Sequence, residues 1–128
     1  MINQCEFILY VSDQEKSCDF YKKVLLLEPV LNVEGMTEFD LAGGTKLGLM
    51  PEKGIAKILG SKMPEPSTGN GIPRCELYLY VNDPNAYIKR SIEAGAVEVS
   101  PLESRAWGDI AGYLADPDGH VIAFAQKL

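Results

Sequence analysis

Two short stretches of alternating apolar and polar residues begin alike and predict two equivalent strands. Residues 5–13 read Cys-Glu-Phe-Ile-Leu-Tyr-Val-Ser-Asp, and residues 75–83 read Cys-Glu-Leu-Tyr-Leu-Tyr-Val-Asn-Asp. Alternation over each stretch is typical of a strand with two different faces. The second stretch begins 70 positions after the first, and Cys, Glu, Leu, Tyr, Val and Asp recur at equivalent positions. The chain is therefore expected to contain two copies of one module.

Each of these strands leads into a stretch with helical spacing. Apolar residues recur every three to four positions over 13–25, and a second helix is expected over 84–94. Ser12 and Glu15 form a possible capping box before the first helix. Asp83, followed by proline, is the expected cap of the second. The first helix has no glycine at its end, so Leu26 is expected to be strained there.

Shorter apolar runs after each helix predict further strands, separated by glycine-containing turns. These strands are expected over 29–33, 36–42 and 45–50, and again over 96–100, 108–115 and 119–126. The sequence Asp116-Pro117-Asp118-Gly119 is a strong turn signal between the last two. Both modules then have the order strand, helix, strand, strand, strand, which places the fold in the α+β class.

The segment between the modules has a different composition. Residues 51–74 contain four of the eight prolines and four glycines, which indicates a linker, with one helical turn near 55–59. A long connection of this kind suits a flap over a binding site. The expected organisation is a single domain with module 1 at 1–50, the linker, and module 2 at 75–128.

Charge and cysteine content narrow the class of protein. The net charge of −6 and pI near 4.7, with scattered Lys and Arg, argue against a nucleic-acid partner. No apolar run approaches 18 residues, so we expect no membrane partner and a cytoplasmic location. Cys5, Cys18 and Cys75 form no metal-binding or disulfide pattern and are interpreted as buried thiols.

Three motifs together resemble a known superfamily. They are Tyr10-Val11-Ser12-Asp13, the helix residues Ser17, Phe20 and Tyr21, and Asp116-Pro117-Asp118-Gly119-His120-Val121-Ile122. This combination resembles the vicinal oxygen chelate superfamily, which includes glyoxalase I, extradiol dioxygenases and bleomycin-resistance proteins. The resemblance implies two βαβββ modules that form a cup-shaped, eight-stranded mixed sheet with helices outside, and a homodimer.

The resemblance also implies where a divalent metal would bind. The positions that match the ligands of the family's metalloenzymes are Glu6, Gly48, Glu76 and Ala123. Gly48 and Ala123 have no ligand atom, so we expect no metal cofactor. The alternative is Zn, Ni, Mn or Fe held by Glu6 and Glu76 with help from water or a partner chain. The only histidine, His120, is interpreted as a turn residue.

Alternation also identifies the residues that face the inside of the expected cup. Those chosen as candidate ligand-binding residues are Glu6, Tyr10, Glu38, Asp40, Met50, Glu76, Tyr78, Tyr80 and Tyr113. Tyrosines with carboxylates could hold a planar or cationic organic molecule by stacking and cation–π contacts. These rings could equally just fill the interior. Arg105 and Trp107 are added because Trp107-Gly108 resembles the Trp-Gly of bleomycin-resistance proteins.

Three functions are compatible with these features. The first is metal-independent binding of a small organic molecule, similar to sequestration by bleomycin-resistance proteins. The second is a glyoxalase-like lyase or isomerase, or a dioxygenase, that uses a metal on Glu6 and Glu76. The third is a structural or regulatory subunit with a closed interior. The two absent ligand positions favour the first function, so we lean away from an enzyme.

Overall fold

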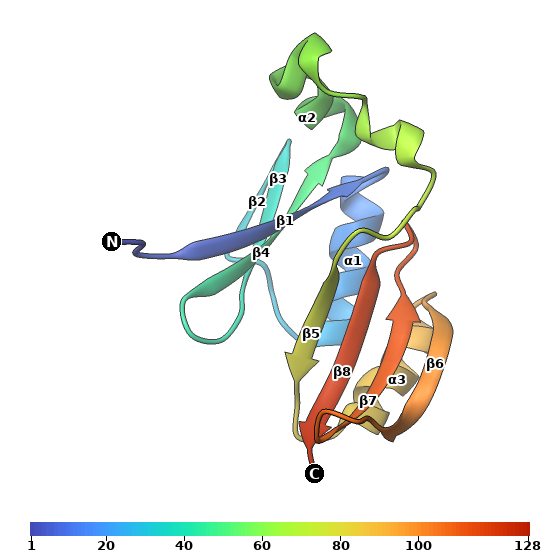
Figure 1. Cartoon of the computed structure of the whole chain (residues 1–128). Coiled ribbons are helices and arrows are strands. Elements are labelled where there is room, and N and C mark those ends of the chain that lie inside the picture. Colours follow the sequence, from blue (N-terminus) through green and yellow to red (C-terminus); the bar gives the residue numbers. More distant parts are fainter. The chain divides into compact units, whose positions relative to one another are not determined.

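The structure is a computed structural model that describes all 128 residues, and these fall into two compact units. Unit 1 comprises Met1–Lys22 and Leu26–Asn70, and unit 2 comprises Lys23–Leu25 and Gly71–Leu128. Each unit contains one four-stranded mixed sheet (Figure 1). None of the helices has the length and hydrophobicity that crossing a membrane would require.

The first module runs from β1 to β4. Its elements are β1 (Cys5–Val11), α1 (Gln14–Leu25), β2 (Leu31–Val33), β3 (Met36–Asp40) and β4 (Thr45–Pro51). The strand order is β1-β4-β3-β2, with β1 parallel to β4 and the other pairs antiparallel. The side chain of Asp13 caps α1 by accepting a hydrogen bond of 3.0 Å from the backbone N–H of Lys16. The expectation that Ser12 is the cap was therefore wrong by one residue.

The segment after β4 is more regular than its proline and glycine content suggests. It contains α2 (Glu52–Leu59) and two 3₁₀ turns, Gly60–Lys62 and Pro66–Gly69. The helix contacts β4 and β1 and buries Ile55. The expected single helical turn is thus a helix of two turns attached to the sheet of unit 1.

The second module repeats the order of the first. Its elements are β5 (Glu76–Tyr80), α3 (Pro84–Glu93), β6 (Val97–Ser104), β7 (Asp109–Ala115) and β8 (Val121–Lys127). The strand order is β5-β8-β7-β6, and β5 runs parallel to β8 (Figure 1). Asp83 caps α3 through a 3.2 Å bond from the N–H of Ala86, as the sequence predicts. The α+β class and the two βαβββ modules are confirmed.

Each sheet buries one face. In unit 1 the buried face carries Val11, Phe39, Leu47 and Leu49. In unit 2 the corresponding face carries Leu114, Ile122 and Phe124, and α3 packs on it with Tyr87 5.1 Å from Phe124 between ring centroids. The opposite face of each sheet holds the residues that alternation assigns to the inside.

The expectation of burial was wrong for two of the three cysteines. Cys5 and Cys75 are exposed, and only Cys18 is buried. Phe7 shares its strand face with buried Leu9 and Val11, yet its side chain is 57% exposed. Cys5 and Phe7 lie in the first half of β1, which is an edge strand, so Phe7 is exposed although its partner Leu47 in β4 is fully buried. Cys75 directly precedes β5. Alternation assigns a face correctly but does not say which strand lies at the edge of the sheet, where a residue on the apolar face can stay exposed.

Helix α1 ends in the left-handed conformation that glycine usually adopts, although the residue there is a leucine. Leu26 is the C-cap, with φ 56° and ψ 43°, which is the left-handed region. A side chain with a Cβ is disfavoured there by about 1–2 kcal/mol. Leu26 thus keeps a strained backbone, and its side chain is exposed.

Candidate functional site

Four aromatic side chains gather on the open face of the sheet in unit 2. They are Tyr78, Tyr80, Trp107 and Tyr113, which we call the aromatic face. The ring of Tyr78 lies 5.4 Å from that of Tyr80 and 6.4 Å from that of Tyr113, both in edge-on geometry. The neighbouring β8 positions are Ala123 and Ala125, so small residues leave room for the rings to lie over the sheet.

Asp109 anchors this face from the first position of β7. Its carboxylate is only 2% exposed, and the hydroxyls of Tyr78 and Tyr80 both donate to Oδ2 at 2.8 Å. The ammonium of Lys127 lies 3.9 Å from Oδ1. The hydrogen bond from Tyr80 is the main cause that lowers the pKa of Asp109, against burial, with Tyr78 and Lys127 adding to it. The buried charge is therefore well compensated.

Trp107 is joined to this network through Tyr78. Its indole Nε1–H donates to the hydroxyl oxygen of Tyr78 at 2.9 Å, and that hydroxyl in turn donates to Asp109. The side chain of Trp107 is nevertheless 60% exposed. Burial raises the pKa of Tyr78, so its hydroxyl keeps the proton that it donates to Asp109. The result is an exposed indole whose polar edge is fixed.

Arg105 stabilises the loop that carries Trp107 through hydrogen bonds to both flanking strands. Its guanidinium donates to the carbonyl oxygens of Ala111 and Pro101, to the hydroxyl of Ser100, and to Glu103 at 3.2 Å. It also lies 5.1 Å from the ring centroid of Tyr113. Because most of its N–H groups are already used, Arg105 contributes mainly by fixing β6 and β7 beside the aromatic face.

A small pocket adjoins the aromatic face at Tyr80. It has a volume of about 240 Å³ and is lined by Tyr80, Val81, Asn82, Gln126 and Lys127. The ammonium of Lys127 lies 4.6 Å from the ring centroid of Tyr80, which is a cation–π distance. A ligand on the aromatic face could therefore extend into a pocket whose mainly apolar lining includes Asn82, Gln126 and Lys127.

Unit 1 contains a second group of sequence-predicted residues around Gly48. The carboxylate of Glu38 pairs with Lys46 at 3.5 Å, and Oε1 of Glu6 is buried without a hydrogen-bond partner. A Cβ added at Gly48 would lie 2.8 Å from that oxygen and 3.0 Å from Cγ1 of Ile8. Burial is the main cause that raises the pKa of Glu6, the neighbouring Glu38 carboxyl raises it further, and Lys46 opposes both.

The remaining predicted residues lie around these two groups. Tyr10 and Met50 are paired positions of β1 and β4, and exposed Asp40 is paired with Lys46, all in unit 1. Glu76 is exposed in unit 2, and its charge contributes to a raised pKa of Tyr113, whose main cause is burial. The predicted residues thus separate into an acidic group in unit 1 and an aromatic group in unit 2.

The donor set does not fit the metal site that the resemblance implies. Gly48 has no side chain, and the space that one would fill is occupied by Glu6. Ala123 is fully buried beside Tyr78 and Tyr113 and offers only a methyl group. A catalytic site of this kind normally needs three protein ligands, often including imidazole. No step of the function proposed below passes through a metal.

His120 lies in the turn predicted from Asp116-Pro117-Asp118-Gly119. Oδ1 of Asp116 accepts hydrogen bonds from the backbone N–H groups of Asp118 and His120, at 2.9 and 2.8 Å. The side chains of Asp116, Asp118 and His120 bring possible ligand atoms within 4.8 Å of one another. The hydrogen bonds of the turn account for this proximity.

Sequence reasoning missed Asp109 and Lys127. Counting back from Tyr113 along β7 in steps of two reaches Ala111 and then Asp109, so alternation already places the carboxylate on the aromatic face. Lys127 is paired with Asp109 in the ladder between β7 and β8. The sequence feature that could have identified Asp109 is an acidic residue at the first position of a buried strand.

One protein family matches almost the whole chain, and solved structures share its fold. The model of the Glyoxalase/Bleomycin resistance protein/Dioxygenase superfamily matches residues 2–124. The uncharacterized protein Mb0911c of Mycobacterium bovis is 29% identical over 94% of this chain and 80% of its own length. A glyoxalase-related enzyme from Fulvimarina pelagi has a TM-score of 0.84 at 21% identity, covering 99% of this chain and 89% of its own. TnmS3, an antibiotic binding protein from Streptomyces sp. CB03234, has a TM-score of 0.70 at 25% identity, covering 100% and 98%.

Proposed function

The chain belongs to the Glyoxalase/Bleomycin resistance protein/Dioxygenase superfamily, and we propose that it binds a small aromatic organic molecule on the aromatic face of unit 2 without a metal ion. The observation that carries this proposal is the chain of hydrogen bonds from Trp107 through Tyr78 to Asp109. It fixes an exposed indole and leaves its ring face open. A rigid ring that is already oriented loses little conformational entropy on binding.

The chemistry of the face favours planar ligands. Exposed Trp107 offers a ring face, whereas the Lys127 ammonium already lies over the ring of Tyr80. Each stacking contact is worth about 0.5–1.5 kcal/mol beyond the area that it buries. The charge of Asp109 is compensated by two tyrosine hydroxyls and Lys127, so it does not require a cationic ligand. A positive group on the ligand would gain mainly from the ring faces. Uncharged and cationic aromatics are therefore the expected classes.

A structurally similar protein supports a binding role. TnmS3 is described as an antibiotic binding protein, and its fold resembles this chain over its whole length. Binding without chemistry also agrees with the two metal-ligand positions that lack a donor atom. By this reasoning the chain sequesters or carries its ligand.

The proposal is tested by a thermal-shift screen of chelator-treated protein against cationic, neutral and anionic aromatic compounds. The dissociation constants of the best compounds are then measured by calorimetry for wild type, Trp107→Ala and the control Ile58→Ala. Ile58 is a strongly exposed apolar residue of α2 in unit 1. Loss of one stacking contact should weaken binding about two- to tenfold in Trp107→Ala alone.

Equal binding by Trp107→Ala and wild type would contradict the site. No stabilisation by any compound would remove the support for a binding role. Elemental analysis of protein purified without added metal and without chelator tests the rival metalloenzyme. Stoichiometric Zn, Ni, Mn or Fe that disappears in Glu6→Ala would favour that rival.

The expected homodimer and cytoplasmic location are part of the same proposal. Phe7 is the residue through which we test the dimer, because its side chain is 57% exposed although its ladder partner Leu47 is fully buried, and it shares its strand face with exposed Cys5. Light scattering of wild type and Phe7→Ser tests it: a wild-type dimer that becomes a monomer in the variant is expected. A wild-type monomer would contradict it.

A further inference from the structure

The acidic group of unit 1, which comprises Glu6, Glu38 and Asp40, contains a lysine at its centre. Lys46 lies on β4, and the strand register pairs it with Glu6 of β1 on one side and with Asp40 of β3 on the other. Side chains of paired positions leave a sheet on the same face, and Glu38 shares that face because it lies two positions from Asp40. One ammonium group is therefore placed among three carboxylates.

The ammonium group of Lys46 acts on two of these carboxylates. Its Nζ lies 3.5 Å from Oε1 of Glu38, and the two side chains are only 26% and 16% exposed. Burial, then a hydrogen bond with Glu38 and repulsion by its charge, raise the pKa of Glu6, whereas the charge of Lys46 lowers it. Because water screens half-buried charges less than exposed ones, Glu6, Glu38 and Lys46 form one interacting group.

The space over Gly48 is closed by the carboxylate of Glu6. Oε1 of Glu6 is buried without a hydrogen-bond partner and lies 2.8 Å from the point that a Cβ of Gly48 would occupy. Cγ1 of Ile8 and Sδ of Met36 lie 3.0 and 3.4 Å from the same point. An anion beside such atoms is poorly solvated. It depends for its charge compensation on Lys46, the paired residue of the neighbouring strand.

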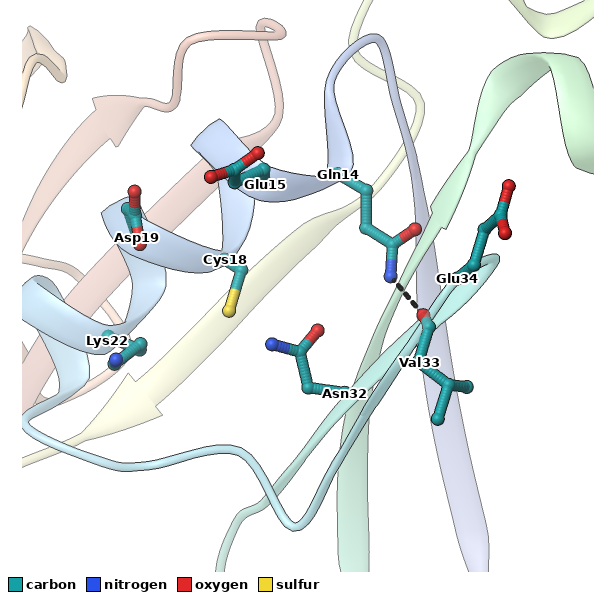
Figure 2. Close-up of a pocket in the computed structure, with 8 residues that line it drawn as sticks. All are labelled: Gln14, Glu15, Cys18, Asp19, Lys22, Asn32, Val33 and Glu34. Atoms are coloured by element: carbon teal, nitrogen blue, oxygen red, sulfur yellow. Dashed lines mark hydrogen bonds between the residues drawn. The ribbon is translucent and has the colours of Figure 1, made fainter.

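The carboxylates beside α1 in the same unit are arranged differently. A cavity of about 410 Å³ between α1 and β2 is lined by Glu15, Asp19 and Glu34, and their carboxylates point away from it without converging (Figure 2). The lysine of this cavity, Lys22, pairs at 3.2 Å with Glu28, whose side chain is 81% exposed. Convergence on a half-buried lysine therefore distinguishes the acidic group on the sheet, and it is not a general effect of the negative charge of the chain.

We propose that Lys46 is the permanent counter-ion of Glu6 and Glu38, and that its ammonium group excludes a divalent metal ion from the acidic group of unit 1. A metal ion could reach Glu6 only beside a positive charge that the chain itself supplies. Repulsion between the two cations is strong in a half-buried site, because the effective dielectric constant is lower there than in water. The proposal concerns unit 1 alone and does not depend on ligand binding by the aromatic face.

The test is a titration of the ¹⁵N-labelled full-length chain with Mn²⁺, followed by ¹H–¹⁵N NMR. Mn²⁺ prefers carboxylate oxygens, and because it is paramagnetic it broadens the signals of nearby amides. The Gly48 amide should stay sharp in wild type. In Lys46→Met the carboxylates of Glu6, Glu38 and Asp40 lose their counter-ion, so the Gly48 amide should broaden at the same Mn²⁺ concentrations. Adding Glu38→Gln to Lys46→Met should abolish the broadening.

Matched variants separate the charge of Lys46 from the net charge of the chain. Lys46→Arg keeps the charge, and Lys22→Met removes one from a more exposed ion pair, so both should leave the Gly48 amide sharp. Without metal, Lys46→Met should lower the melting temperature by about 3–8 °C, and Lys22→Met by less. Lys46→Gln, which keeps N–H donors, replaces Lys46→Met if that variant does not fold. Equal broadening in wild type, no broadening in the folded neutral variant, or equal losses of stability would overturn the proposal.

Discussion

The indole nitrogen of Trp107 donates a hydrogen bond of 2.9 Å to the hydroxyl oxygen of Tyr78. The two residues are 29 positions apart in sequence, and the bond fixes a loop residue on a strand residue of the same unit. Because Tyr78 also donates to Asp109, the exposed ring depends on a buried charge for its orientation. The predictions about stability and binding in unit 2 follow from this chain of contacts.

Replacing Asp109 by Asn should destabilise the protein in a pH-dependent way. The pKa of Asp109 is lowered by folding, so the carboxylate stabilises the fold above its unfolded pKa of about 3.9. This contribution is lost as the pH falls through the lowered pKa. Urea unfolding should therefore show Asp109→Asn less stable than wild type at pH 7 and pH 5, with a smaller difference at pH 3. A difference that grows on acidification, or an equal effect in exposed Glu98→Gln, would contradict the role of Asp109.

Replacing Glu6 by Gln should have the opposite sign. The pKa of Glu6 is raised by folding, so the folded state favours the protonated carboxyl, whose contribution is complete below the unfolded pKa of about 4.3. It is lost as the pH rises through the raised pKa. Glu6→Gln keeps the shape without the charge and should be more stable than wild type at pH 7, with a gain that disappears near pH 4. Unfolding free energies between pH 4 and 8 measure this, and a less stable Glu6→Gln at pH 7 would contradict it.

Gly48→Ala should destabilise unit 1 by about 1–3 kcal/mol, because the new methyl group would overlap Glu6 and Ile8. The same substitution in a Glu6→Ala background should cost less, by about 0.5–2 kcal/mol, since one of the two contacts is gone. The control is Gly54→Ala in α2, where the added atom meets only Pro51 at 4.0 Å. That variant should be neutral or stabilised by up to about 1 kcal/mol. Additive effects of Gly48→Ala and Glu6→Ala would show that the two positions do not interact.

Leu26→Gly should stabilise the protein although it removes a large apolar side chain. Leu26 has a left-handed backbone, and its side chain is 64% exposed. Glycine removes the steric cost of this conformation, and the expected net gain is about 0.5–1 kcal/mol after the greater freedom of the unfolded chain is included. Leu27 has no positive φ, so Leu27→Gly should instead be destabilised. Denaturant midpoints of the two variants should move in opposite directions, and a parallel loss would contradict the strain at Leu26.

The sequence predicted the modules well because their signals are local. Alternation, short apolar runs and turn residues located all eight strands, although β6 (Val97–Ser104) continues past its expected end at residue 100. The lack of a glycine after α1 predicted the strain at Leu26, whose backbone is left-handed. The identity of Asp109 as an anchor was not predicted, because it depends on which hydroxyls reach across β5, β8 and β7. The attachment of the β2–β3 hairpin to α1 was not predicted either, since it depends on three long-range hydrogen bonds of Gln14, with Val33, Gly35 and Thr37. Contacts between distant residues leave no periodic pattern in the chain.

Trp107 is the only tryptophan, so its fluorescence reports directly on the aromatic face. The most direct test is a titration of wild-type protein in excess chelator with the best aromatic compound from the thermal-shift screen, followed by the emission of Trp107. The account predicts a saturable change in emission with one ligand bound per chain and the dissociation constant found by calorimetry. A compound that binds but leaves the emission of Trp107 unchanged, or that binds only when a metal is restored, would contradict it.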